Sequence, residues 1–208
     1  MHLLSASFSD GQAIPDRYAA GQPDAQTTVT FSDNLNPHLE WDEVPEGTQS
    51  FVLICCDPDA PSVGDDVNQP DREVPEELPR TDFFHWVLVD LPARRRAIAE
   101  GEFSAVFTPR GKPGPDGPDG TRQGLNDYTG WFAQDLELAG EYHGYDGPFP
   151  PYNDARVHDY VFTLFALDVP RCPVERSFTG AQVRKALRGH VLAKASLTGT
   201  YTLNIRLR

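Results

Sequence analysis

The chain has 208 residues, and its 18 basic and 31 acidic side chains give a net charge of −13. This balance argues against duplex nucleic acid as a partner, because neutralising phosphates needs a basic face, and against charge attraction to anionic membranes. With 39% hydrophobic and 11% aromatic residues, the sequence is too apolar for a disordered chain. Its length is that of about one domain, so a single domain is predicted over residues 1–208.

The first half of the chain contains three predicted strands. β-Branched residues predict a short strand over 27–31. The continuous apolar run 51–56 is typical of a strand that is buried on both faces. The prolines in Asp57–Pro61 predict the end of that strand, because proline cannot donate to a ladder. A second apolar run, 83–89, predicts another buried strand.

Loops separate these strands from a third long one. Residues 62–80 are acidic and contain prolines, which predicts a solvated loop. Residues 108–120 are the most turn-dense stretch and predict an exposed loop. Strand signals continue on both sides of that loop, so it is expected inside a domain and not between two. Residues 157–167 form the longest strand candidate.

One helix is predicted near the C-terminus. Thr179 and Gln182 form a capping-box pattern. Apolar residues then recur at helical spacing, namely Val183, Ala186, Leu187, Val191 and Leu192. Gly189 predicts a kink or a break between two short helices, and an alternating strand over 197–207 closes the chain. These elements predict a mostly β fold, an antiparallel β sandwich with one or two C-terminal helices on an edge.

The cysteines and the N-terminus bear on the compartment. Cys55 and Cys56 would point to opposite faces of a strand, so they are not expected to pair with each other. Without a C-x-x-C pair, a thiolate zinc site is not expected either, and Cys172 completes a set of three buried thiols. No signal peptide or transmembrane run is apparent. The sequence therefore predicts a cytoplasmic protein.

Common catalytic signatures are missing from the sequence. It has no phosphate-binding G-x-x-x-x-G-K-[ST] loop, no G-x-S-x-G elbow and no H-E-x-x-H helix. Nucleotide hydrolysis and serine-esterase chemistry are therefore unsupported, and no cofactor is expected.

Polar residues instead lie where the predicted buried strands begin or end. Asp57 and Asp59 follow the first strand, His85 opens the second, and His158 and Tyr160 open the third. If these strands are neighbours, the side chains meet on one rim, where binding groups usually lie. The alternatives are that the aspartates serve only the turn and that His85 is a core histidine with satisfied hydrogen bonds. His158 and Tyr160 share one strand face, which favours a joint role.

The order of these motifs resembles the phosphatidylethanolamine-binding protein family, also called Raf kinase inhibitor-like. The resemblance covers roughly residues 15–207 and rests on Asp57–Pro61, His85–Val89, Gly147-Pro148 with Pro150-Pro151, and His158–Phe162. Gly189–Ala193 and Gly199–Tyr201 look like the closing helix and strand of the bacterial and archaeal branch.

The resemblance implies a β sandwich with a small anion pocket at one end. Family pockets hold phosphate, phosphoethanolamine-like or acetate-like groups, and bacterial relatives imply a homodimer. Carried onto this sequence, the ligand-binding residues are Asp57, Asp59, Pro61, His85, Gly147, Pro148, His158 and Tyr160. The family loop also suggests a cis peptide bond between Ala60 and Pro61.

The sequence departs from the family pattern in three places. The family commonly has Arg between the histidine and tyrosine of the third strand, where this chain has Asp159. The loops 108–120 and 129–143 look longer than in compact relatives. The second insertion is expected to cover the site or to make an oligomer contact, with Trp131 and Phe132 as its anchors.

Three functions follow from this reading. The first is a non-catalytic binding protein for a small phosphorylated or carboxylate ligand, held by protonated His85 and His158, with Asp57 orienting one ring. The second is a regulatory protein that binds and inhibits a kinase or a protease. The third is a metal-dependent hydrolase that uses His85, His158 and Asp57.

Overall fold

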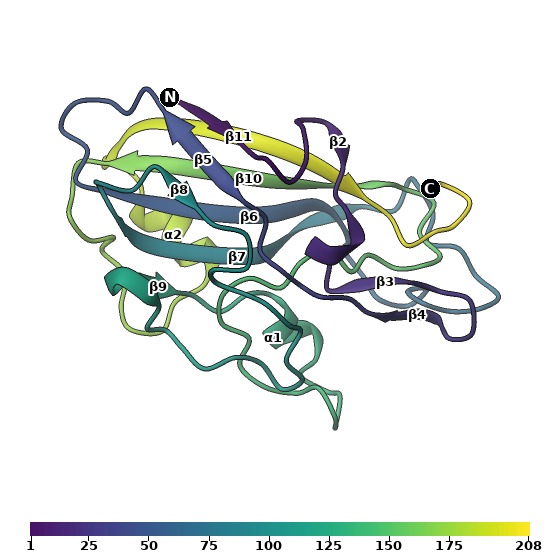
Figure 1. The fold of residues 1–208 in the computed structure, drawn as a ribbon. Helices are drawn as coiled ribbons and strands as arrows, with labels where there is room; N and C mark the ends of the chain where they lie inside the picture. The colour runs from purple at the N-terminus through teal and green to yellow at the C-terminus, as the bar shows by residue number, and fades with distance from the viewer.

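The computed structural model describes residues 1–208, and its largest element is a sheet of six strands (Figure 1). All neighbouring strands are antiparallel except the pair at one edge, β2 and β11. From edge to edge the order is β2 (Gln12–Ala13), β11 (Val191–Tyr201), β10 (His158–Leu167), β6 (Ser50–Pro61), β7 (Arg80–Pro92) and β9 (Arg122–Gln123). The three strands predicted to carry the polar motifs, β6, β7 and β10, are therefore direct neighbours.

A smaller sheet covers one face of the large one. Its order is β1 (His2–Leu4), β5 (Leu39–Asp42) and β8 (Ala97–Ile98). Leu39, Trp41 and Ile98 of this sheet are buried in one hydrophobic cluster with Phe51 and Leu53 of β6. The two sheets form the predicted β sandwich, and the mostly β fold is confirmed.

The remaining elements are short. In chain order they are η1 (Asp16–Tyr18), β3 (Gly21–Asp24), β4 (Thr28–Phe31), η2 (Pro118–Gly120), α1 (Tyr128–Trp131) and α2 (Gly180–Ala186). Strands β3 and β4 pair with each other as an antiparallel ribbon. With 4 and 7 residues, α1 and α2 have neither the length nor the apolar character to cross a membrane.

Strand β6 is buried on both faces because α2 and its flanking segments cover the second face of the large sheet. Phe51, Leu53 and Cys55 belong to the cluster under the small sheet. Their neighbours Val52, Ile54 and Cys56 belong to a second cluster, which includes Val183 and Leu187. This double burial explains the continuous apolar run of the sequence. Cys55 and Cys56 face opposite sides, and all three cysteines are free thiols, as predicted.

The prediction that prolines end this strand at residue 57 is wrong, because β6 continues to Pro61. Its pairing with β7 is irregular between Asp57 and Ala60. Pro58 lies in this irregular step, where the ladder needs no N–H donor from it. The Ala60–Pro61 bond, expected to be cis, is trans, and the cis peptide bond of the chain is Gly114–Pro115.

The C-terminal helix is shorter than predicted. The predicted start at the Thr179 capping box is confirmed, since the Thr179 N–H donates to Gln182 Oε1 at 2.8 Å. The helix ends at Ala186, however, and Gly189 reverses the chain with a positive φ of 85°. Val191 and Leu192 therefore belong to β11, which spans Val191–Tyr201 and not the predicted 197–207.

The two predicted insertions pack against each other. Residues 108–120 contain only η2, and residues 129–143 contain only the end of α1. The Arg110 N–H donates to the Tyr142 hydroxyl at 3.1 Å. A Cβ on Gly111 would lie only 1.9 Å from the Glu141 carbonyl oxygen, so the two backbones are in close contact there.

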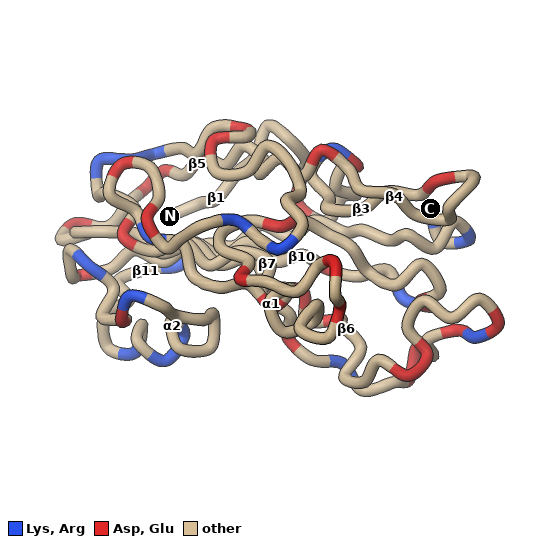
Figure 2. Tube along the Cα trace, turned by 90° about the horizontal axis from the view of Figure 1, so that it is seen from below, with Lys and Arg blue, Asp and Glu red and all other residues tan.

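Charged side chains are concentrated on the loops (Figure 2). The loop between β6 and β7 is the predicted acidic one, and it carries Asp65, Asp66, Asp71, Glu73, Glu76 and Glu77. This loop forms part of the rim of the cavity described below.

Gly180→Ala is expected to lower the free energy of unfolding by about 1–3 kcal/mol, the usual cost of overpacking a core. The reason is that a Cβ there would lie 2.2 Å from Cδ1 of the buried Phe84 ring. Gly130→Ala in α1 is the matched control, since its Cβ would meet no atom within 4 Å. That change should be neutral or stabilising by about 1 kcal/mol. Urea unfolding of both variants checks this, and equal stabilities would contradict the packing of α2 on β7.

Candidate functional site

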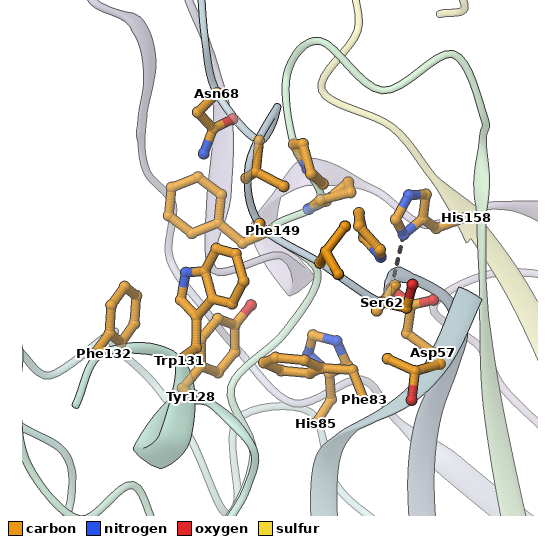
Figure 3. A pocket seen from close by; sticks show the side chains of 18 of the residues that line it. Asp57, Ser62, Asn68, Phe83, His85, Tyr128, Trp131, Phe132, Phe149 and His158 are labelled. Carbon is orange, nitrogen blue, oxygen red and sulfur yellow. Dashed lines mark hydrogen bonds and ion pairs between the residues drawn. The ribbon is translucent and has the colours of Figure 1, made fainter. Parts of the chain in front are cut away.

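A cavity of about 320 Å³ lies where β6, β7 and β10 meet at one end of the sandwich (Figure 3). Among the predicted ligand residues, Asp57, Pro61, His85, His158 and Tyr160 line it. Three others do not line it, namely Asp59, Gly147 and Pro148. Aromatic residues and prolines make up half of the remaining lining residues.

Gly147 and Pro148 shape the cavity through their backbone. The Gly147 carbonyl accepts hydrogen bonds from the Tyr128 hydroxyl at 2.8 Å and from His85 Nδ1 at 3.1 Å. A Cβ on Gly147 would lie 2.1 Å from the Tyr18 carbonyl oxygen, so only glycine fits this close approach. The Pro148 carbonyl accepts two backbone N–H groups at 2.9 and 3.2 Å. Both residues therefore position the wall formed by the next three residues.

His85 is held as one neutral tautomer. Its Nδ1–H donates to the carbonyls of Asp146 at 2.8 Å and Gly147 at 3.1 Å. Burial lowers the pKa of His85, and the nearby Asp57 only partly opposes this. Because Nδ1 carries the proton, Nε2 keeps its lone pair as a hydrogen-bond acceptor. The proposed protonation of His85 in the presence of an anion stays a prediction, and burial works against it in the free protein.

A buried polar network fixes the carbonyls that orient His85. The Asp146 side chain is fully buried. Its carboxylate accepts from Asn34 and Asn126 at 2.8 Å each and from Lys112 at 2.9 Å. Asn34 also accepts the Gly147 N–H at 2.8 Å. The buried Asp146 carboxylate is thus fully hydrogen-bonded, which makes the turn at Asp146 and Gly147 rigid.

His158 is charged, and both of its ring nitrogens face carboxylates. Nδ1 lies 2.8 Å from Asp57 Oδ2, and Nε2 lies 3.0 Å from Asp154 Oδ2. Burial works against the charge, but the hydrogen bonds to Asp154 and Asp57 outweigh it and raise the pKa of His158 to about 9. Both ring N–H groups therefore donate to carboxylates. The prediction that Asp57 orients one ring is confirmed, and that ring is His158.

Arg80 completes this chain of charges. Its guanidinium binds Asp154 in a two-pronged arrangement, with N–O distances of 2.6 and 3.0 Å. The remaining N–H groups of Arg80 donate to backbone carbonyls, including that of Asp59 at 2.9 Å. Burial alone would raise the pKa of Asp154, but the bonds from His158 and Arg80 lower it overall.

Asp59 and Asp159 belong to the outer edge of this network. Asp59 Oδ1 accepts from Arg156 Nη1 at 3.0 Å, and Oδ2 accepts the Asp159 N–H at 3.0 Å. Arg156 therefore supplies a cation beside Asp59, although position 159 lacks the arginine common in the family. Burial, and then Asp59, raise the pKa of the Asp159 carboxyl. Asp59 supports the site from outside the cavity.

The Tyr160 hydroxyl is the one polar group of the cavity wall that is buried without a partner. Tyr160 is fully buried, and its ring lies against the edge of His85 with 5.0 Å between ring centroids. A buried hydroxyl without a hydrogen bond is costly and uncommon in proteins. Within the protein, therefore, neither Tyr160 O–H nor His85 Nε2 has a hydrogen-bond partner.

Two segments border the mouth of the cavity. The acidic loop is pinned by Asn153, whose amide nitrogen lies within 2.8–3.2 Å of the carbonyl oxygens of Asp66, Gln69 and Arg72. Asn153 Oδ1 accepts the Asn68 N–H at 2.9 Å. Asn68 and its neighbours before it in the loop line the cavity.

The second segment is α1 with its C-terminal neighbour, where the longer insertion begins. Tyr128, Trp131 and Phe132 line the cavity. Phe132 stacks on Tyr128 at 5.5 Å between centroids and packs near Tyr142 at 5.6 Å, so it anchors the segment as predicted. Trp131, the other predicted anchor, is 48% exposed and does not hold the segment in place. Two residues of the insertion, Trp131 and Phe132, thus line one side of the cavity, and its role as a cover or as an oligomer contact stays a prediction.

The groups named for a metal centre are not arranged as one. No set of three or more His, Cys, Asp and Glu side chains is placed to hold a metal ion. Both nitrogens of His158 already face carboxylates, and His85 Nδ1 faces two carbonyls. The hydrolase alternative therefore lacks the converging ligands that it needs.

Several residues of the site were not predicted. Asp154 stands four residues before His158, and this spacing was a usable signal for a contact between them. Arg80, Tyr128 and Asn153 gave no such signal, because their partners are distant in the sequence.

Sequence comparisons identify relatives over nearly the whole chain. The model of the phosphatidylethanolamine-binding protein family matches residues 4–202. The UPF0098 protein YbhB of Escherichia coli K12 is 33% identical, over 97% of this chain and 100% of its own length. A UPF0098 protein of Aquifex aeolicus is 32% identical, over 97% of this chain and 88% of its own length.

Solved structures agree with the sequence. The crystal structure of E. coli YbcL, described as a new member of the mammalian PEBP family, has a TM-score of 0.68 at 25% identity and covers 97% of both chains. A PEBP homologue from Chlamydia trachomatis has a TM-score of 0.62 at 29% identity, covering 96% of this chain and 95% of its own. On its sequence and its fold, this chain belongs to the phosphatidylethanolamine-binding protein family.

Proposed function

We infer that the chain is a binding protein whose cavity takes up a small phosphorylated or carboxylate ligand together with one proton. The observation that carries this proposal is that the buried Tyr160 hydroxyl has no partner and that the Tyr160 ring packs against His85, whose Nε2 makes no hydrogen bond. The cavity volume of about 320 Å³ is at the lower end of small-molecule sites. The cytoplasmic location, the homodimer and the single domain stay predictions.

The two free groups suit an anion that shares a proton with the protein. Tyr160 O–H can donate to a charged ligand oxygen. His85 Nε2 can accept the acidic hydrogen of a phosphate monoanion or a carboxylic acid, or take that proton and donate to the anion. The carboxylate of Asp57 would repel an anion if it were alone, but it is paired with His158 at 2.8 Å.

The same geometry favours binding over turnover. A nucleophile needs a base within hydrogen-bonding distance. His158 cannot act as that base, since both of its nitrogens donate to carboxylates. His85 is hydrogen-bonded only to carbonyl oxygens, and no serine, threonine or cysteine is hydrogen-bonded to it.

Proton uptake sets the pH dependence. The groups that face His85 are Asp57 from β6, Asp146 from the turn, Tyr128 from α1 and Tyr160 from β10. Burial lowers the pKa of His85 below its ordinary value of 6.5, so the free ring is neutral at pH 7. An anion favours the protonated ring, and its binding therefore takes up a proton and weakens as the pH rises.

Tyr160→Phe is expected to weaken binding of inorganic phosphate on the order of tenfold to a hundredfold, the usual value of a hydrogen bond to a charged group. The variant should unfold no more easily than the wild type, because the hydroxyl has no partner in the protein. Isothermal titration calorimetry and urea unfolding measure the two quantities. Unchanged affinity in Tyr160→Phe would remove the hydroxyl from the site.

Phosphate affinity is expected to fall as the pH is raised from 5.5 to 8, by up to about tenfold per pH unit once His85 is neutral. Titration of the imidazole signals by NMR at several pH values checks this. His85→Gln is the control, because glutamine cannot take up the proton, and its weaker affinity should vary less with pH. A flat affinity in the wild type across this range would rule out the shared proton.

His158 is expected to make stability fall at alkaline pH. Its pKa is raised from 6.5 to about 9, so its contribution is complete below pH 6.5 and is lost as the pH rises through 9. The shift corresponds to about 3 kcal/mol at most. The free energy of unfolding should therefore drop by that amount more in the wild type than in His158→Gln between pH 6.5 and 10. Parallel pH profiles would show that the ring is not charged in the folded protein.

A further inference from the structure

The cavity has a polar end and an aromatic end. In Figure 3, Asp57 and His158 lie on one side, while Trp131, Tyr128 and Phe132 lie on the other, with Phe149 above them and His85 between the two ends. The proposed function uses only the polar end. The aromatic end has no role in it.

Trp131 differs from every other ring at that end. Tyr128 packs against Phe83 and Phe132, with centroids 5.1 and 5.5 Å apart. Phe149 contacts the Phe31 ring edge-on at 6.0 Å. Trp131 makes no ring pair with any aromatic side chain of the protein and is 48% exposed, yet it lines the cavity. Its ring is therefore free to pack against something inside the cavity.

The position of Trp131 also narrows the entrance. A Cβ placed on Gly64 would lie 3.7 Å from Trp131 Cη2, so the indole reaches the loop on the opposite rim. Gly64 leaves room there for the indole and has no side chain that could cover it. A flat group can enter beside the indole and lie against its face.

The volume limits the size of the occupant. At about 30 Å³ for each water-sized group, a cavity of about 320 Å³ holds on the order of ten non-hydrogen atoms. A phosphate and one six-membered ring fill such a space. The acyl chains of a phospholipid do not fit inside it together with the headgroup.

We propose that Trp131 is a specificity-determining residue, which selects phosphate monoesters that carry a single aromatic ring. This inference rests on the proposed function, since the phosphate would bind at His85 and Tyr160. The ring would lie against the indole in the offset or edge-on arrangement that aromatic pairs prefer. An ammonium group is a weaker candidate for this end, because the nearest cavity carboxylate, Asp57, is already paired with His158.

The test compares three ligands on the full chain at pH 5.5, namely phenyl phosphate, butyl phosphate and inorganic phosphate. Phenyl phosphate should bind about tenfold more tightly than butyl phosphate, since an aromatic pair adds to the apolar area that both bury. Binding should also change the tryptophan fluorescence, because Trp131 is exposed while Trp41 and Trp86 are buried.

Trp131→Ala should remove the preference for phenyl phosphate, a loss of about tenfold, and leave inorganic phosphate within twofold. Trp131→Phe should retain most of the preference, because phenylalanine keeps a ring at the site. Leu136→Ala is the matched control in the same segment, since Leu136 is 93% exposed and does not line the cavity. Circular dichroism confirms that each variant folds.

The outcomes separate the two proposals. Equal affinities for phenyl and butyl phosphate, or a preference that persists in Trp131→Ala, would overturn the role of Trp131 and leave the phosphate site intact. Absence of binding by all three ligands at millimolar concentration would overturn the phosphate site itself. Phosphoethanolamine is titrated as a fourth ligand, and tighter binding of it than of phenyl phosphate would overturn the proposal by showing that the aromatic end holds an ammonium group.

Discussion

The hydrogen bond between Asp57 and His158 joins β6 and β10 at the point where their ladder stops. The last backbone pair on that side is Cys56 with Val161, and beyond it the two strands no longer pair. The cavity lies in the space that this separation leaves, and the 2.8 Å contact between the two side chains spans it. Removing His158 would leave the buried Asp57 carboxylate without its cation, and breaking a buried ion pair in this way typically destabilises a protein by about 3–5 kcal/mol. The shape of the site therefore depends on a charged contact between β6 and β10.

The charges of the site are almost all committed inside the protein. Arg80, His158 and Asp154 satisfy one another, and Asp146 is satisfied by two amides and a lysine. A ligand therefore meets hydrogen-bonding groups and not a free cation. For the anion proposed above, such a site would discriminate by protonation state as well as by charge, since the lone pair of His85 Nε2 accepts a hydrogen bond or a proton. The acidic surface of the protein adds to this, because it opposes the approach of dianions more than that of monoanions.

Much of the fold follows from local sequence. The apolar run 51–56 predicts a strand buried on both faces, and the structure covers both faces of β6. The errors arose where a longer-range contact decides the outcome. Pro58 does not end β6, because an irregular step in the pairing with β7 accommodates it. Val191 and Leu192 have helical spacing, but pairing with β10 places them in a strand.

The sequence predicts four residues of the site but not the protonation states of its two histidines. The motifs identified Asp57, His85, His158 and Tyr160, and the structure brings all four to one cavity. Which histidine carries the charge depends on partners far away in the sequence. His85 faces carbonyls some 60 residues away, whereas His158 lies between two carboxylates. In the local sequence only Asp154, four residues before His158, indicates that difference, and no residue near His85 does.

The side chain of Asn153 holds several points of the acidic loop at the rim of the cavity. Its one amide group holds three carbonyls of the acidic loop together with the Asn68 N–H. These contacts share a single side chain, so its removal would free several points of the loop at once, while the hydrogen bonds from Tyr152 to Asn68 would remain. For the ligand proposed above, a change at Asn153 would therefore alter the rate of release although Asn153 does not line the cavity.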